Sequence, residues 1–190
     1  MKYLIQMKYL IQMKYLILLL LLMGTSVPAK EKRMIEKEQL RTLITTTLKE
    51  FHKETRGKVA YSDTAVELLM MTAAHESKLG TYLAQMNGPA LGMFQMEPAT
   101  EEDIWDNYLH YRPELELAIS QFSMGDMYPE EMKWNLKYAI VMARIHYYRV
   151  PQALPEGYKE LAEYAKEHYN TQEGKATSEK YLEDYYKYAI

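Results

Sequence analysis

The sequence predicts an all-α fold. Apolar residues recur at intervals of three and four along several segments, which is the spacing of one face of a helix. No stretch of useful length alternates apolar and polar residues, as a strand with one buried face would. With 190 residues, 48% of them hydrophobic, the chain is long enough for one ordinary globular domain.

Two helices are expected in the first half of the chain. The first follows a charged connector, residues 30–37, and closes at Gly57; its stripe consists of Leu40, Leu43, Ile44, Leu48 and Phe51. Ser62 or Asp63 is expected to cap the second helix, because short polar side chains accept hydrogen bonds from the first free backbone amides. That helix ends near Gly80, and its stripe consists of Val66, Leu69, Met70 and Ala73.

A loop separates these helices from the next one. Residues Asn87–Pro98 hold several glycines and prolines and predict loop and turn. A helix over Ala99–Tyr108 follows, with Thr100 as its expected cap and three acidic residues in its first turn, where they complement the helix dipole.

The second half predicts three more segments of the bundle. Met132–Val150 is a long, mostly apolar helix of the kind that lies at the centre of a bundle. Another helix begins at Pro155, and Thr177 or Ser178 caps a final tyrosine-rich helix. We divide the chain into a leader (1–29), an N-terminal helix with its connector (30–59) and a main domain (60–190).

The leader has the three parts of a secretory signal. The hexapeptide Met-Lys-Tyr-Leu-Ile-Gln occurs twice and begins again at Met13; an apolar run, Tyr15–Met23, and a small-residue end, Val27-x-Ala29, follow. The apolar run is too short for a membrane span, which needs about 20 residues. We expect export to the periplasm or cell envelope, with a signal over residues 13–29. An uncleaved N-terminal anchor is the alternative, and Met13 is an alternative start.

Composition excludes several classes of function. The chain has no cysteine, which rules out disulfides, thiolate metal sites and cysteine nucleophiles. Residues 1–29 hold three of the 23 basic side chains and none of the 26 acidic ones, so the rest carries a net charge of −6. An acidic domain is poorly suited to nucleic acid, because phosphates need a basic face. No metal-ligand spacing such as His-Glu-x-x-His occurs, and we expect no metal, no cofactor and a monomer.

Glu76 is the candidate catalytic residue. It lies three positions after Ala73 and seven after Leu69, on the apolar stripe of the second helix. Burial disfavours the charged form of a carboxyl and raises its pKa, which suits a general acid near neutral pH. A glutamate on an apolar face can also be a partnered structural residue. Glu67 points away from the stripe and is expected to be solvated, and His75 is expected to be structural or a contact at the rim.

The loop after Glu76 contains a glycine-rich turn. Gly88 and Gly92 permit backbone conformations and close approaches that side chains would block. Gln95 carries both a donor and an acceptor, which suits the hydroxyl and amide groups of a sugar.

Three motifs in order give the chain a resemblance to a known family. They are Glu76-Ser77, then Gly88-x-Ala90-x-Gly92-Met93-x-Gln95-Met96-x-Pro98-x-Thr100, then Ala165-x-x-x-Tyr169-Asn170 with Gly174 shortly after. This order resembles the soluble lytic transglycosylases and the related goose-type lysozymes over roughly residues 60–175. The resemblance implies a lysozyme-like helical fold.

The resemblance also implies an activity on peptidoglycan glycan strands. Glu76 would protonate the glycosidic oxygen between N-acetylmuramic acid and N-acetylglucosamine. It would then take the proton of the sugar's 6-hydroxyl, which closes a 1,6-anhydro ring without water. Ser77, Gln95 and the backbone around Met93 would hold the substrate, while Tyr169 and Asn170 would line the site and support Glu76.

Three residues depart from the family pattern. Pro89 stands where the transglycosylases have a glycine, and Phe94 replaces a residue that is commonly Met. Glu97 matters more, because the goose-type lysozymes carry an aspartate there. A carboxylate opposite Glu76 would activate water and give inverting hydrolysis, whereas a Glu97 that turns outward would play no part. The same motifs are also compatible with a non-catalytic wall-binding protein and with a phage lysis enzyme.

Overall fold

Helices make up the fold, as the sequence predicts. The computed structural model describes residues 13–14, 35–125, 128–170 and 176–190. Within these ranges there is no strand, only the isolated bridges Ala84–Leu91 and Leu91–Met96. The protein is all-α, and Arg33–Ile190 forms one compact unit. The predicted signal segment lies outside the described residues, apart from Met13 and Lys14.

The first two helices of this unit have side-chain caps at their N-termini. Glu36 precedes α2 (Lys37–Glu54) and accepts from the amides of Glu38 and Gln39. Ser62 precedes α3 (Asp63–Ser77) and accepts from the Ala65 amide, so Ser62 rather than Asp63 is the cap. Because α3 is buried along most of its length, it belongs to the core of the unit.

The next helix begins earlier than predicted. α4 (Pro98–Ile104) has Glu97 in the N-cap position and Pro98 in its first turn, so Thr100 lies inside the helix and does not cap it. The reason is that proline fits the first turn of a helix, where its missing N–H costs nothing. A π-helical turn, η1 (Trp105–Leu109), continues α4, with the His110 amide bonded to the Trp105 carbonyl.

The predicted helix over Met132–Val150 is shorter than expected. A 3-10 turn, η2 (Pro129–Lys133), comes first, and α6 (Leu136–Tyr148) begins after Asn135, whose side chain accepts from the Tyr138 amide. An Asn cap interrupts the apolar run, which the periodicity alone does not reveal. A helix that we did not predict, α5 (Pro113–Ser120), precedes η2.

The last two helices carry much of the site. α7 (Tyr158–Tyr169) starts after Gly157, so Pro155 precedes the helix instead of beginning it. α8 (Ser178–Tyr188) is capped by Thr177, which accepts from the Lys180 amide. One face of α8 buries Tyr181, Tyr185 and Tyr188.

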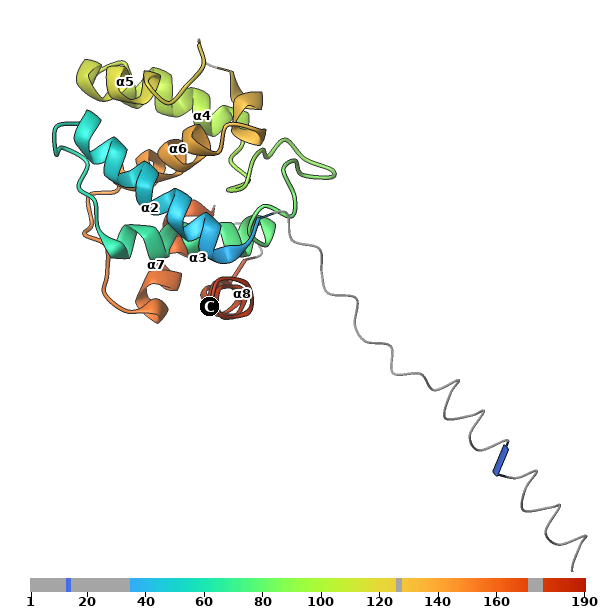
Figure 1. Ribbon diagram of the computed structural model, residues 1–190. Coiled ribbons are helices and arrows are strands. Elements are labelled where there is room, and N and C mark those ends of the chain that lie inside the picture. Colours follow the sequence, from blue (N-terminus) through green and yellow to red (C-terminus); the bar gives the residue numbers. More distant parts are fainter. Residues whose placement is uncertain (1–12, 15–34, 126–127, 171–175) are drawn as a thin grey trace, which may run out of the picture. The chain divides into compact units, whose positions relative to one another are not determined.

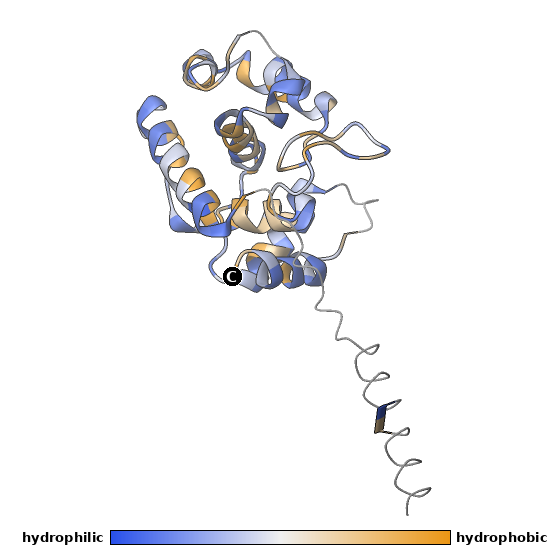
Figure 2. Cartoon of the chain, turned by 45° about the vertical axis from the view of Figure 1, so that its right-hand side comes forward, coloured by the Kyte–Doolittle hydropathy of each residue, from blue (hydrophilic) through white to orange (hydrophobic). Residues whose placement is uncertain are grey.

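α6 lies at the centre of the unit (Figure 1). α4 and α5 pack on one side of it and α3 and α7 on another, while α2 crosses in front. α8 packs along α3 and α7. The orange, hydrophobic faces of the helices turn toward one another in Figure 2. Among the described residues, no helix combines the length and apolar character that crossing a membrane requires.

Candidate active site

Glu76 lies in the last turn of α3, where the helix stops abruptly. Lys78, Leu79 and Gly80 follow with φ values of 51°, 58° and 79°. Three successive residues in the left-handed region are unusual, and such strain gathers at functional sites. The carbonyl end of a helix also disfavours a negative charge, so this is a position where a carboxyl tends to stay protonated.

Burial raises the pKa of the Glu76 carboxyl above the ordinary range of a glutamate. The hydrogen bond from Tyr181, the charge of a protonated His75 and the hydrogen bond from Asn170 act in the opposite direction but do not cancel the effect. Because the side chain is half-buried, it combines desolvation with access from outside. Glu76 therefore has the property that a general acid needs.

The two hydrogen bonds to Glu76 end on the same oxygen. Tyr181 donates its hydroxyl to Oε1 at 2.8 Å, and Asn170 donates its amide to Oε1 at 3.1 Å. The Asn170 amide also donates to the Tyr181 hydroxyl. An oxygen that already accepts two donors is a poor place for the proton of a neutral carboxyl, so that proton belongs on Oε2.

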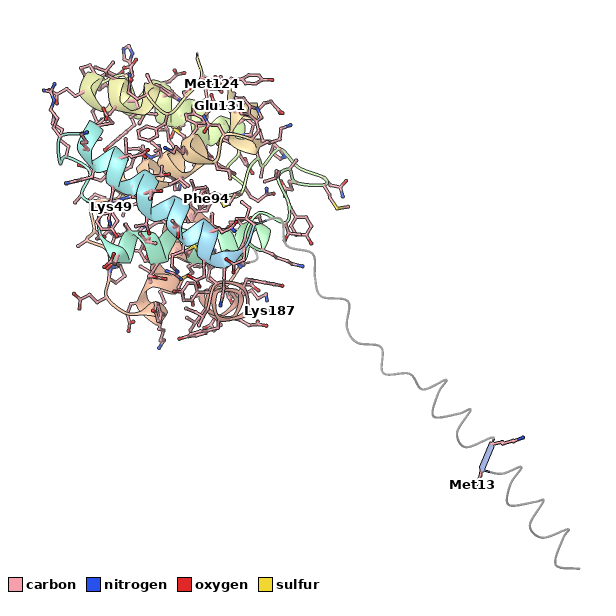
Figure 3. The ribbon with its side chains drawn as sticks, viewed as in Figure 1. Met13, Lys49, Phe94, Met124, Glu131 and Lys187 are labelled. Carbon is pink, nitrogen blue, oxygen red and sulfur yellow. The ribbon has the colours of Figure 1, made fainter. Side chains whose placement is uncertain are left out.

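The two residues of the predicted Tyr-Asn pair contact different parts of the site. Asn170 contacts Glu76, as expected, but the Tyr169 hydroxyl donates to the Phe94 carbonyl at 2.9 Å. Tyr169 therefore ties the end of α7 to the glycine-rich turn and supports Glu76 only indirectly. Figure 3 labels Phe94 in the interior of the unit, where its side chain is 1% exposed.

The turn over residues 92–95 is closed by its own backbone. The Leu91 and Met96 amides and carbonyls exchange hydrogen bonds of 2.9 and 3.0 Å. Gly92 has a φ of +73°, and a Cβ there would lie 2.3 Å from the Met132 carbonyl. Glycine is thus required at position 92 both by conformation and by the approach of η2. Gly88 has no positive φ, so it is not needed in the same way.

The structure corrects the expected roles of Ser77 and Met93. Both whole residues are 0% exposed, so neither the Ser77 hydroxyl nor the Met93 backbone is open to a substrate. The Ser77 hydroxyl donates to the Met93 carbonyl at 2.5 Å and accepts from the Gly80 amide at 2.8 Å. Ser77 therefore links the turn to the end of α3 through buried hydrogen bonds, which is a structural role.

Gln95 and Glu97 lie on the turn and just after it. Gln95 is half-buried with a φ of +48°, and its amide donates to the Gly92 carbonyl at 2.7 Å. Part of its hydrogen-bonding capacity therefore holds the turn in shape. Glu97 is exposed and its side chain caps nothing. Glu97 therefore has a side chain that is open to solvent and is not used to cap α4.

Sequence reasoning missed Tyr181 and misplaced Glu67. Tyr181 is 0% exposed and contacts Glu76 across 105 positions of sequence. Burial and the neighbouring Glu76 raise the pKa of Tyr181, so its hydroxyl stays a neutral donor. The spacing of the tyrosines that α8 buries is the signal that marks this face. Glu67 is half-buried instead of simply solvated: it forms an ion pair with Arg41 and accepts from the Tyr185 hydroxyl.

A buried carboxyl lies beyond the turn, in α4. Glu101 is 0% exposed and accepts from the Tyr138 hydroxyl, which in turn accepts from the Trp105 indole at 3.0 Å. Its second oxygen, Oε2, has no hydrogen-bond partner. Burial raises the pKa of Glu101, and the nearby Glu131 adds to this.

Glu131, unlike Glu101, has hydrogen-bond partners for both of its carboxylate oxygens. Met124 and Glu131 are labelled close together in Figure 3, and Oε1 accepts from the Met124 amide at 2.9 Å. The Asn135 amide and the Ser123 hydroxyl donate to the same carboxylate at 2.6 and 2.8 Å. These bonds brace η2, whose Met132 carbonyl approaches Gly92, so they support the turn from the other side.

Among the described residues, no group of three or more histidine and acidic side chains could hold a metal ion. The site as described consists of a buried carboxyl, two donors on one of its oxygens and a closed turn. Comparison with protein-family models, curated proteins and solved structures finds no match for this chain.

Proposed function

We propose that this protein cleaves the β-1,4 bond between N-acetylmuramic acid and N-acetylglucosamine in peptidoglycan, as a lytic transglycosylase. The observation that carries the proposal is the state of Glu76, a half-buried carboxyl with a raised pKa and both of its donors on Oε1. The order of the motifs, which resembles that of the soluble lytic transglycosylases, supplies the substrate class.

The geometry supports a reaction in which Glu76 acts twice. The proton on Oε2 passes to the glycosidic oxygen as the bond from that oxygen to C1 of the muramic acid breaks. The resulting carboxylate is stabilised by Tyr181 and Asn170, which both donate to it. It then accepts the proton of the 6-hydroxyl of the same sugar, and the 6-oxygen bonds to C1. No water is consumed, and Glu76 ends protonated as it began.

The surroundings of Glu76 favour this route over hydrolysis. Among the described residues, the groups that act on the Glu76 pKa are Tyr181, His75 and Asn170, and none is a carboxylate. Inverting hydrolysis needs a second carboxylate on the far side of the sugar, about 6.5–9.5 Å away. Glu97, the candidate for that role, is exposed, and it is not among the groups that shift the Glu76 pKa.

The proposed substrate also indicates the compartment in which the protein acts. Peptidoglycan lies outside the cytoplasmic membrane, which agrees with the predicted export signal over residues 13–29. Wall remodelling by the host and lysis by a phage use the same chemistry, and the proposal covers both. It requires no metal, cofactor, nucleic acid or second subunit.

Two glutamine variants test the assignment. Glu76→Gln keeps the shape of the side chain but has no proton to donate, so digestion of purified sacculi should fall by about 100-fold or more. Glu97→Gln is the matched control and should stay within about twofold of the wild type.

The contrary outcomes would favour different functions. Equal losses in both variants would favour a hydrolase in which Glu97 activates water. Binding of muropeptides without turnover by the wild type would favour a wall-binding protein. Full activity of Glu76→Gln would contradict the proposed function, because it would show that Glu76 is not the general acid.

A further inference from the structure

The residue before Glu76 makes contacts that the proposed chemistry leaves unexplained. The His75 ring stacks on the Tyr181 ring, with centroids 3.9 Å apart and an interplanar angle of 25°. Its Nδ1 lies 2.9 Å from Oδ2 of Asp184. Their side chains are only 14% and 9% exposed, so this is an enclosed pair and not a surface contact.

Asp184 is itself held in place. Its second oxygen, Oδ1, accepts from the Lys180 ammonium at 2.7 Å. Lys180, Tyr181 and Asp184 lie within about one turn of α8, where residues three and four apart share a face. One face of α8 therefore presents the tyrosine that contacts Glu76 together with the carboxylate that holds His75.

This arrangement controls the position of the Tyr181 hydroxyl. A tyrosine side chain has two torsions, and a neighbour stacked on its face restricts both. The Asp184 contact prevents His75 from turning about its own bonds. The hydroxyl that donates to Glu76 Oε1 is thus fixed through a ring whose orientation depends on His75 and Asp184.

We propose that His75 and Asp184 are positioning residues, which hold the Tyr181 ring so that its hydroxyl stays on Glu76. The proposal rests on the proposed function for its effect on turnover, but the placement of the hydroxyl can be measured without it. Neither residue contacts the substrate in this proposal.

The His75–Asp184 pair is one of several contacts that hold α8. The helix is also anchored by the Tyr185 hydroxyl, which donates to Glu67, and by the ion pair of Glu67 with Arg41. We therefore expect removal of Asp184 to leave α8 packed on α3 and to loosen only the end that carries Tyr181. A loss of activity in a variant that still folds with α8 in place would then indicate a positioning role and not a merely structural one.

The experiment compares Asp184→Ala with Asp184→Asn. Both remove the negative charge, but only asparagine keeps an oxygen that can accept from the His75 ring, so their difference isolates the contact from the charge. Each is made alone and with Tyr181→Phe. The readouts are kcat and KM on sacculi, and the pKa of Glu76 from carbon-13 NMR of its carboxyl, assigned with Glu76→Gln.

We expect Asp184→Ala to lower kcat by about tenfold with KM changed by less than about twofold, since the lost contact serves the transition state. The pKa of Glu76 should rise in Asp184→Ala and in Tyr181→Phe, because each withdraws a donor from the carboxylate. The double variant should show little further change, and Asp184→Asn should stay near the wild type.

The opposite pattern would overturn the proposal. Equal values in the alanine and asparagine variants would mean that the contact positions nothing, and independent effects of Asp184→Ala and Tyr181→Phe would mean that they act separately. If Asp184→Ala does not fold, His75→Phe, which keeps a ring, against His75→Ala makes the same comparison. The NMR titration needs no turnover, so it also decides the matter if sacculi are not a substrate.

Discussion

At the scale of single residues, the protein contains buried ionisable side chains whose burial costs folding free energy. Glu76 and Glu101 are carboxyls whose pKa values are raised chiefly by burial. Arg144, on α6, is 7% exposed, its Nε has no partner, and no carboxylate contacts it among the described residues. Such groups lower stability, and proteins retain them where function requires it or where selection has not removed them.

Glu76→Gln should stabilise the protein in a pH-dependent way. Because the folded-state pKa is raised, the wild type keeps its full stability below the unfolded-state pKa and loses it as pH rises through the folded-state pKa. Glutamine does not ionise, so the variant should be more stable than the wild type near pH 7, and the gain should vanish toward about pH 4. Urea unfolding across this range measures it; a gain that grows at low pH would contradict the account.

Arg144→Met should raise the thermal stability. Methionine keeps much of the aliphatic volume and removes a buried guanidinium that contacts the Ala60 carbonyl at 3.5 Å and the Tyr148 ring at 5.6 Å but no carboxylate among the described residues. We expect a gain of about 1 kcal/mol in the free energy of unfolding, because the cost of burying the charge is removed. For a unit of this size, about 1 kcal/mol corresponds to about 2–4 °C in Tm. Arg149→Met is the control, since Arg149 pairs with Asp103, and it should give no gain. A lower Tm for Arg144→Met would show that the contacts with the Ala60 carbonyl and the Tyr148 ring outweigh the cost of burying the charge.

At the scale of elements, the site depends on how short segments are fastened to the helices. Ser77 holds the turn over residues 92–95 to the end of α3, and Tyr169 holds it to the end of α7. η2 closes it from the remaining side, through the Met132 carbonyl. The turn therefore has three anchors on different helical segments, and its shape is set by tertiary contacts as much as by its own sequence.

Gly92→Ala tests this dependence. A Cβ would strain the positive φ and meet the Met132 carbonyl, so we expect a loss of about 2 kcal/mol or more in the free energy of unfolding. Gly125→Ala is the control, because a Cβ there meets nothing within 4 Å. Thermal unfolding of both variants measures the difference. An equally small change in the two would mean that the turn tolerates side chains and is not held as described.

Much of the element order can be predicted, because helical periodicity and caps are local signals. Ser62 and Thr177 cap as expected. The predicted helix starts are wrong where tertiary contacts or turn residues set the boundary. This happens at Glu97 before α4 and at the 3-10 turn before α6. In the site, the motifs predict Glu76 and Asn170. They do not predict Tyr181, because its place depends on how α8 packs against α3.

At the scale of the whole molecule, the folded unit brings four distant segments to one place. The ends of α3 and α7, the turn over residues 92–95 and one face of α8 meet around Glu76. α6 and α2 complete the core against which these elements pack. The fold thus holds a half-buried carboxyl with a raised pKa next to its two donors, which is the preorganisation that the proposed reaction requires.

The most direct test of the central claim is the mass of the muropeptides released from sacculi by the wild type. A single carboxylate that uses the sugar's own 6-hydroxyl gives products with 1,6-anhydro ends, each lighter by one water than the product of hydrolysis. We predict such ends, and we predict that Glu76→Gln abolishes them. Release of full-mass reducing ends would contradict the account, because it would show that water enters the reaction.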